Sequence, residues 1–349
     1  MSTPAAPAEA PFASAAALRR ARRVRGAWLV ALVGALVAAC VLSVALGSRD
    51  VTWPEIWGGV TGGPGFAEAA VAKRVPRTVL AAVAGAALAV SGLVLQGITR
   101  NPLSDPGILG INTGASLGIV TGIAWFGLTS ATSYIWVAIA GAAVTATLVW
   151  FVGSLGHGGA TPLKLTLAGA ATAAALSSFV TAVVLPRPDI SESVVSWQIG
   201  GVGGATTAGL WQVTPFLLVG ALISLWCARG LNMLGLGDDL ASGLGERVAR
   251  TRVLAALGAV TLAGAATAVT GPIGFVGLVV PHFCRLLAGV DHRWLLPFSA
   301  IGGAVLLIVA DVTGRLITPP GEVDVGIITA IVGAPIFIAV VRYSRVREL

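Results

Sequence analysis

Charged side chains are scarce in this sequence. Asp, Glu, Lys and Arg make up 11% of its 349 residues, against about 25% in a soluble domain. Apolar residues make up 56%, and the mean hydropathy is +0.90. This balance argues against a water-soluble domain. Because the apolar runs are long and continuous rather than short and alternating, they also argue against an outer-membrane barrel. They indicate a polytopic helical membrane protein.

Cysteine and histidine are too few and too scattered to build a metal site. The sequence has three of each, at Cys40, Cys227, Cys284, His157, His282 and His292. The cysteines show neither zinc-ligand spacing nor a disulfide framework, so we interpret them as small core residues. No histidine pair has ligand spacing on one helix face. We therefore expect no metal or cofactor bound by this chain.

Catalytic motifs are missing as well. The chain has no GxxxxGK[ST] phosphate loop, so it cannot itself supply ATP hydrolysis. An intramembrane enzyme would need a nucleophile with a base, and none is found. An ion-coupled secondary transporter would need ionisable groups at mid-membrane, and the centres of the apolar segments contain almost none. A nucleic-acid partner is not expected either.

Apolar runs long enough to cross a bilayer are, by contrast, abundant. A spanning helix needs about 20 mostly apolar residues, and ten segments qualify. They cover residues 27–47, 76–99, 107–128, 134–155, 163–186, 211–229, 252–270, 273–290, 295–316 and 324–343. We expect the Ala/Pro-rich residues 1–26 to form a disordered cytoplasmic tail. Residues 27–349 would form one all-α transmembrane domain.

The distribution of positive charge and an internal sequence repeat predict the topology. With the N-terminus in the cytoplasm, sixteen Lys and Arg residues fall inside and six outside, as the positive-inside rule requires. Ten spans return the C-terminus to the cytoplasm. Residues 84–92 (AGAALAVSG) and 263–271 (AGAATAVTG) match at seven of nine positions, in segments of opposite direction. The match predicts two inverted-repeat halves, a transporter architecture; the alternative is a chance match of two Ala/Gly-rich helices.

One charged stretch interrupts the apolar chain. Residues 235–252 read GLGDDLASGLGERVARTR and form the longest predicted cytoplasmic loop. Leu240, Leu244 and Val248 recur at i, i+4 and i+8, which predicts a short amphipathic helix over residues 237–249, parallel to the membrane. It could lie on lipid, fit a groove in a partner protein, or be a solvated loop. Its candidate contact residues are Asp238, Leu240, Ala241, Leu244, Gly245, Glu246 and Val248.

Four stretches resemble one known family. They are residues 231–252 (LNMLGLGDDLASGLGERVARTR), 74–118, 271–297 and 310–342. These stretches are similar to the FecCD/BtuC-like permease subunits of type II ABC importers, the iron–siderophore, haem and cobalamin uptake family. The similarity extends from about residue 27 to the end. It implies a fold of ten transmembrane helices with two related halves.

The resemblance also implies partners and a cargo. The 237–249 helix would sit in a cleft of a separate ATPase subunit, which binds ATP and Mg²⁺. Two such ATPase subunits, a second identical or paralogous permease chain and an extracytoplasmic substrate-binding protein would complete the importer, in the cytoplasmic (inner) membrane of a bacterium. Ferric siderophores are the commonest cargo of the family and are the cargo we expect. Haem and cobalamin remain alternatives.

Three arginines are candidates for docking the binding protein. Arg74 and Arg77 lie at the outer end of the second segment and Arg315 at the outer end of the ninth. The resemblance implies that they pair with acidic residues of the partner, and exposed charges of this kind can steer association. The alternative is interfacial snorkelling, with Arg315 pairing Asp311 one turn back.

Two loops are candidates for a cytoplasmic gate. In RNPLSDPG (100–107), the resemblance assigns Asn101 and Leu103 to the gate; a tight connecting turn is the alternative. In the loop before the fifth segment, Thr161 and Pro162 would form the other part. Residues 191–204 are too polar and Gly-rich to span, so we expect either a short surface or re-entrant helix outside the membrane, or a plain connecting loop.

Overall fold

The protein is helical throughout the part that the computed structural model describes, which is residues 15–47, 51–63, 65–156, 161–319 and 321–343. Ten helices coincide with the ten predicted spans to within a few residues at most ends. They are α1 (Ala15–Ala45), α3 (Phe66–Thr99), α4 (Ile111–Phe126), α5 (Ala131–Ser154), α6 (Pro162–Val184), α8 (Thr207–Trp226), α11 (Val248–Thr270), α12 (Val276–Ala288), α13 (His292–Ile317) and α14 (Val325–Tyr343). Eight of these are long and apolar enough to cross a membrane, while α4 and α12 are shorter.

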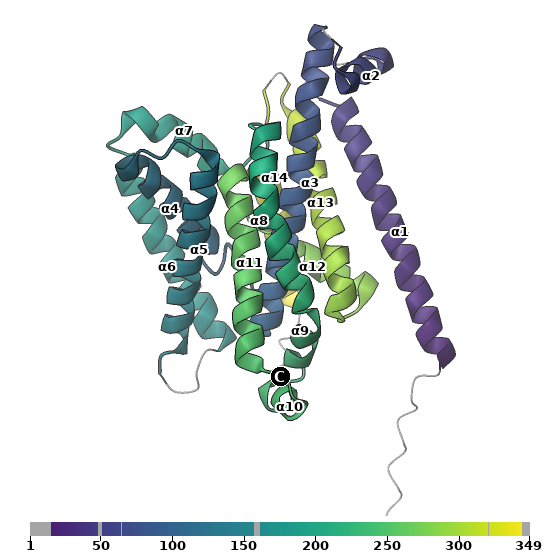
Figure 1. Cartoon of the computed structure of the whole chain (residues 1–349), viewed down its shortest axis with the longest axis vertical. Coiled ribbons are helices and arrows are strands. Elements are labelled where there is room, and N and C mark those ends of the chain that lie inside the picture. The colour runs from purple at the N-terminus through teal and green to yellow at the C-terminus, as the bar shows by residue number, and fades with distance from the viewer. Residues whose placement is uncertain (1–14, 48–50, 64, 157–160, 320, 344–349) are drawn as a thin grey trace, which may run out of the picture.

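Four short helices complete the described chain. They are α2 (Trp53–Thr61), α7 (Pro188–Ile199), α9 (Ala228–Leu234) and α10 (Asp238–Gly243). In Figure 1, α2 and α7 lie at the upper end of the molecule and α10 lies at the lower end. These ends are called the α7 end and the α10 end below.

The first helix begins earlier than expected. The sequence predicts a disordered tail over residues 1–26, whereas α1 starts at Ala15. Residues 1–14 lie outside the described part. Residues 15–25 read AAALRRARRVR. Alanine and arginine are strong helix formers, so the apolar helix extends into this charged segment. The expectation of disorder is therefore wrong for residues 15–26.

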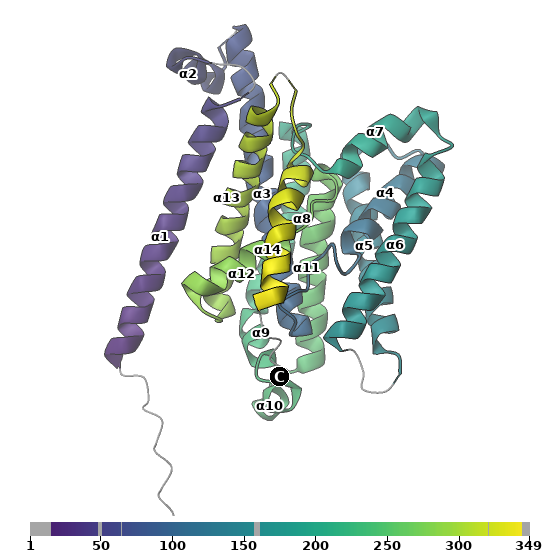
Figure 2. The same cartoon turned by 180° about the vertical axis from the view of Figure 1, so that it is seen from behind.

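The long helix α3 forms the centre of the molecule. In its most apolar stretch 78% of residues are buried, against 67% in α11 and only 11% in α1. Helices α13, α11 and α12 pack around α3, and α4, α5 and α6 form a group on the far side of α11 (Figure 1). Seen from behind, α14 runs beside α12 and α13 (Figure 2). Helix α1 is peripheral.

Glycine allows the central helices to approach without intervening side chains. A Cβ on Gly85 of α3 would collide with the carbonyl oxygen of Gly303 of α13, and the converse holds. A Cβ on Gly92 of α3 would likewise collide with the carbonyl oxygen of Gly277 of α12. Small residues at such crossings let helix backbones pack closely in a membrane. The abundance of glycine and alanine in the sequence therefore has a direct role in the core.

The loop after α3 folds back into the protein. An oxygen of Asp105 lies near Gly277, which in turn packs on Leu88 and Gly92 of α3. Leu88 precedes the end of α3 at Thr99 by about three helical turns. After α3 ends, the chain therefore runs back along α3 towards the α7 end before α4 begins at Ile111. Because the loop already covers part of this distance, α4 is short. The Asp105 carboxylate accepts a hydrogen bond from the Gly107 backbone N–H at 2.8 Å.

Candidate functional site

The predicted amphipathic helix is split in two. Helix α10 ends at Gly243, and Gly245 follows with φ +85°, a left-handed conformation that glycine adopts without steric cost. The chain reverses there, and Val248 is already the first residue of α11. The expected single helix over residues 237–249 is therefore wrong in extent. Two glycines in three positions favour a turn over helix continuation.

Two leucines of this segment face outward. Leu240 and Leu244 are 63% and 64% exposed, whereas Ala241 between them is fully buried. Val248 does not extend the exposed stripe, because it packs against the main core from α11. The expected three-residue apolar stripe is thus a pair of exposed leucines. Gly245 lies beside Leu244 and is exposed.

Ion pairs attach α10 to the membrane helices. Asp238 lies 2.8 Å from Arg252 of α11 and 3.8 Å from Arg100, which follows α3. Glu246 accepts a hydrogen bond from the Thr251 hydroxyl in the first turn of α11. Asp238 and Glu246 therefore join the loop to the ends of α3 and α11, and a force applied to α10 reaches the two most buried helices.

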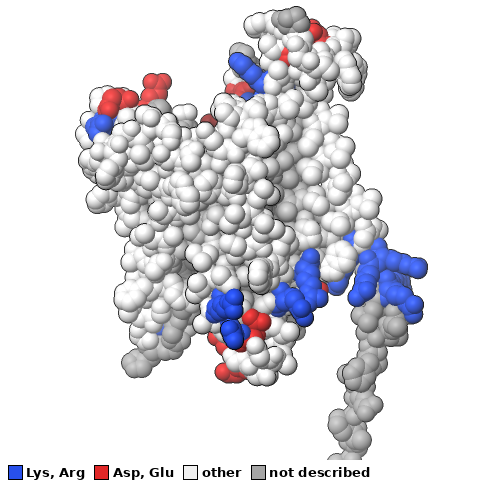
Figure 3. Space-filling view, viewed as in Figure 1, with Lys and Arg blue, Asp and Glu red and all other residues white. Residues whose placement is uncertain are grey.

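A basic cavity lies beside the exposed leucines. It has a volume of about 550 Å³ and is lined by residues of the α8–α9 junction and of the loop after α10. Its charged lining residues are Arg229, Glu246, Arg247 and Arg250. Figure 3 shows lysine and arginine side chains gathered at this end of the molecule, along α1 and around α9–α11. The surface thus combines two leucines with a cationic hollow.

A polar cluster connects α9 to the start of α13. The Asn232 side chain donates to Asp291 at 2.7 Å, and its oxygen accepts from the His292 backbone N–H at 2.8 Å. Nearby, Arg285 of α12 donates to Gln96 of α3 at 2.5 Å. Sequence reasoning missed Asn232; a polar residue three positions before the G-x-G of the charged loop was its only signal.

The two halves of the expected gate lie on separate elements. Asn101 is buried after α3, and its side-chain oxygen accepts from the Leu103 backbone N–H at 3.0 Å. Thr161 caps α6, with Pro162 as the first helical residue. No hydrogen bond or ion pair joins the two pairs among the described residues. His157, in the same loop as Thr161, lies outside the described residues.

The three candidate docking arginines sit at the α7 end, and two of them are buried. Arg74 is 8% exposed and donates to the carbonyl oxygens of Val44 and Ala45, each at 3.0 Å. Arg315 is 2% exposed and donates to those of Ser43 and Leu46 at 3.0 and 2.8 Å. These carbonyls terminate α1 and have no helical partner of their own. Both arginines therefore fasten the end of α1.

Arg77 has a different environment. Its Nε donates to Asp311 at 2.8 Å, and its Nη1 lies 2.6 Å from an oxygen of Glu322. The Asp311 side chain is fully buried and also lies 2.9 Å from Arg315, whereas that of Glu322 is 37% exposed. The anticipated Arg315–Asp311 pair is thus confirmed as part of a larger network. Nearby Lys73 is exposed, with no ion pair to any described residue.

The polar stretch 191–204 contains a helix. Helix α7 covers Pro188–Ile199 and lies across α4 and α6 in Figure 1. The prediction of a short surface helix is therefore correct, and the prediction of a plain connecting loop is not. Arg187 at its start forms two hydrogen bonds to Asp189, at 2.9 and 3.0 Å. These bonds hold the pKa of Asp189 below its usual value.

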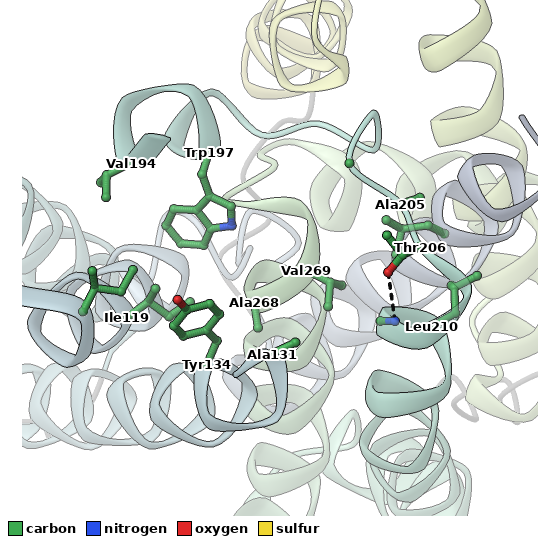
Figure 4. A pocket seen from close by; sticks show the side chains of 14 residues that line it. Ile119, Ala131, Tyr134, Val194, Trp197, Ala205, Thr206, Leu210, Ala268 and Val269 are labelled. Atoms are coloured by element: carbon green, nitrogen blue, oxygen red, sulfur yellow. Dashed lines mark hydrogen bonds between the residues drawn. The ribbon is translucent and has the colours of Figure 1, made fainter. Parts of the chain in front are cut away.

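An apolar cavity of about 360 Å³ lies beneath α7. Figure 4 shows Trp197 of α7 and Tyr134 of α5 on one side of it, and Ala205, Thr206 and Leu210 on the other. Thr206 caps α8 by accepting from the Gly209 N–H at 3.1 Å. Within the described residues, no three His, Cys, Asp or Glu side chains gather as metal ligands.

Comparison with known proteins gives a consistent result. A family model described as the FecCD transport family matches residues 35–343. The chain is 40% identical over 316 residues to the probable siderophore transport system permease protein YfiZ of Bacillus subtilis (strain 168), covering 90% of this chain and 95% of that protein. It is 41% identical over 309 residues to the ferric enterobactin transport system permease protein FepD of Escherichia coli (strain K12), covering 88% and 92%.

A solved structure extends the likeness to the fold. It is described as an inward-facing conformation of a metal-chelate type ABC transporter, and it superimposes with a TM-score of 0.76 at 29% sequence identity. The match covers 93% of this chain and 99% of that one. The ten-helix architecture is therefore that of a type II ABC importer permease.

Proposed function

The chain belongs to the FecCD transport family and is the membrane-spanning permease subunit of an importer, and we propose that its cargo is a ferric siderophore. The names of two relatives, for siderophore and ferric enterobactin transport, support this cargo. Haem or cobalamin moved by the same machinery is the alternative. An ion-coupled mechanism is disfavoured, because the ion pairs described above lie near helix ends rather than along a mid-membrane relay.

ATP would be hydrolysed by two separate ATPase subunits, which bind the nucleotide and Mg²⁺. The α10 end would face them in the cytoplasm, with both termini on that side. The concentration of Lys and Arg at this end supports the orientation, as Figure 3 illustrates. A second permease chain, identical or paralogous, would complete the membrane pore.

The exposure of Leu240 and Leu244 is the observation that carries the coupling proposal. Large apolar side chains that project from a charged loop are typical of a surface that a partner covers. The leucines would fill a groove of the ATPase subunit. Asp238 and Glu246 would pass the resulting movement to α3 and α11, to which they are bonded.

The α7 end would receive an extracytoplasmic substrate-binding protein. Arg77 is the docking candidate that reaches the surface, and exposed Lys73 adds a second positive charge beside it. Arg74 and Arg315 would support the surface indirectly, by holding α1. Asn101, Leu103, Thr161 and Pro162 would be the cytoplasmic gate residues, since one of their loops precedes α4 and the other precedes α6.

Uptake of labelled cargo tests this proposal. Cells with and without the gene are offered ferric siderophores, ferric citrate and haem separately, with cobalamin in parallel. We expect the deletion to abolish uptake of a ferric siderophore alone, and the wild-type gene to restore it. Normal iron uptake with loss of haem or cobalamin would replace the cargo and keep the machinery. Normal uptake of all four would contradict the transport function.

A further inference from the structure

Among the three candidate docking arginines, Arg77 is the most exposed. Its inner edge is fixed, since Nε and Nη2 both lie 2.8 Å from one oxygen of the buried Asp311. Its Nη1 is covered by Glu322, at 2.6 Å. The Arg77 side chain retains 15% exposure. A carboxylate arriving from outside would therefore meet a site already occupied by a carboxylate of this chain.

Glu322 is placed so that its side chain can move away from Arg77 into water. It lies on the connection between α13 and α14, which projects at the α7 end in Figure 2, and its side chain is 37% exposed. Asp311, by contrast, has a fully buried side chain between Arg77 and Arg315. Moving Glu322 into water leaves no buried charge without a partner, because Asp311 continues to neutralise the inner edge of Arg77.

We propose that Glu322 occupies the position of a carboxylate of the substrate-binding protein, and that docking replaces Glu322 on the Nη1 of Arg77. The inference rests on the proposed importer function and adds a regulatory contact to it. The intramolecular pair keeps Arg77 oriented and neutralised while no partner is bound. The pair also competes with docking. A partner with an acidic surface therefore binds more weakly than it would if Arg77 had no contact with Glu322.

The charges around the site fit an acidic partner. Lys73 is exposed on the same helix, one turn before Arg77, and has no ion pair to any residue in the described part of the chain. Once Glu322 has moved aside, Lys73 and the Nη1 edge of Arg77 present positive charge on one turn of α3, with the Asp324 carboxylate also close to Arg77. Exchange of one exposed carboxylate for another changes the free energy little, since such pairs contribute about 0–1 kcal/mol. The competition therefore tunes affinity without blocking docking.

The test measures binding of the purified substrate-binding protein of the same transport system to the assembled transporter in nanodiscs. The variants are Glu322→Gln, Arg77→Gln and the double substitution. Glu192→Gln is the matched control, because Glu192 is an exposed acid on α7 at the same end. It removes the same charge without touching Arg77, so it measures the long-range electrostatic effect alone.

We expect Glu322→Gln to lower the Kd about two- to fivefold beyond the effect of Glu192→Gln. In the Arg77→Gln background, Glu322→Gln should have no such effect. If the Kd of Glu322→Gln equals that of the control, or is higher, the proposal that Glu322 competes with the partner is refuted. If the binding protein does not bind the wild-type transporter at all, the proposed docking function fails instead, so the two failures are distinguishable.

Discussion

Arg315 of α13 donates a hydrogen bond to the carbonyl oxygen of Leu46 at 2.8 Å, across 269 positions of sequence. The same guanidinium group bonds Ser43, so it caps the end of α1 from a neighbouring helix. Helix α1 is otherwise the least buried of the long helices. The contact therefore fastens a peripheral helix to the transporter core.

Replacing Arg315 should loosen α1. Arg315→Met removes the bonds to α1 and one partner of the buried Asp311, and loss of one member of such a network costs about 3 kcal/mol. We expect a lower thermal midpoint of the purified protein and faster proteolysis after α1. Lys73→Met, at an exposed residue of the same end with no ion pair to a described residue, serves as the control. Equal thermal midpoints for the two variants would refute the capping role.

The Asp238–Arg252 pair should be exchangeable. Asp238→Arg alone places three arginines together, because Arg100 also lies close to Asp238. We expect it to reduce transport several-fold while the protein remains folded. The swapped double variant, Asp238→Arg with Arg252→Asp, should recover part of the activity in an uptake assay. No recovery would mean that the two residues act independently of their pairing.

The exposed leucines should matter for coupling and not for folding. Leu240→Asp with Leu244→Asp leaves the permease core intact, because both side chains already face outward. We expect normal membrane levels, loss of co-purifying ATPase subunit and loss of uptake. Ser242→Ala, on the same short helix, is the control and should behave as wild type. Retained ATPase binding in the double variant would exclude these leucines from the interface.

The Gly85–Gly303 crossing should not accept a methyl group. A Cβ on Gly85 would overlap the Gly303 carbonyl, whereas a Cβ on Gly34 of α1 meets nothing within 4 Å. Overpacking of this kind costs about 1–3 kcal/mol. We expect Gly85→Ala to lower the thermal midpoint and Gly34→Ala to leave it unchanged or slightly higher. A neutral Gly85→Ala would show that α3 and α13 can separate freely.

The sequence predicted the spanning helices well because each is a long apolar run with few interruptions. All ten have counterparts among the described helices. The failures have local causes. The loop after α10 depends on the left-handed Gly245, which places Val248 in the next helix. The start of α1 at Ala15 depends on the high helix propensity of the Ala- and Arg-rich residues that precede the apolar segment.

The candidate site was harder to predict because its side chains are paired across long sequence distances. The family resemblance pointed to Arg74, Arg77 and Arg315 together, but only three-dimensional packing separates the two buried arginines from Arg77. The partner of Arg77, Glu322, is 245 positions away. The exposure of Leu240 and Leu244 was foreseeable from their spacing, whereas the inward turn of Val248 was not.

Transport by the reconstituted complex tests the central claim most directly. The permease chains and ATPase subunits are placed in proteoliposomes with ATP inside, and the binding protein loaded with a radiolabelled ferric siderophore is added outside. We predict ATP-dependent accumulation of label by the wild type, and none with the Leu240→Asp, Leu244→Asp variant. Equal accumulation without ATP, or full activity of that variant, would contradict an importer driven through α10.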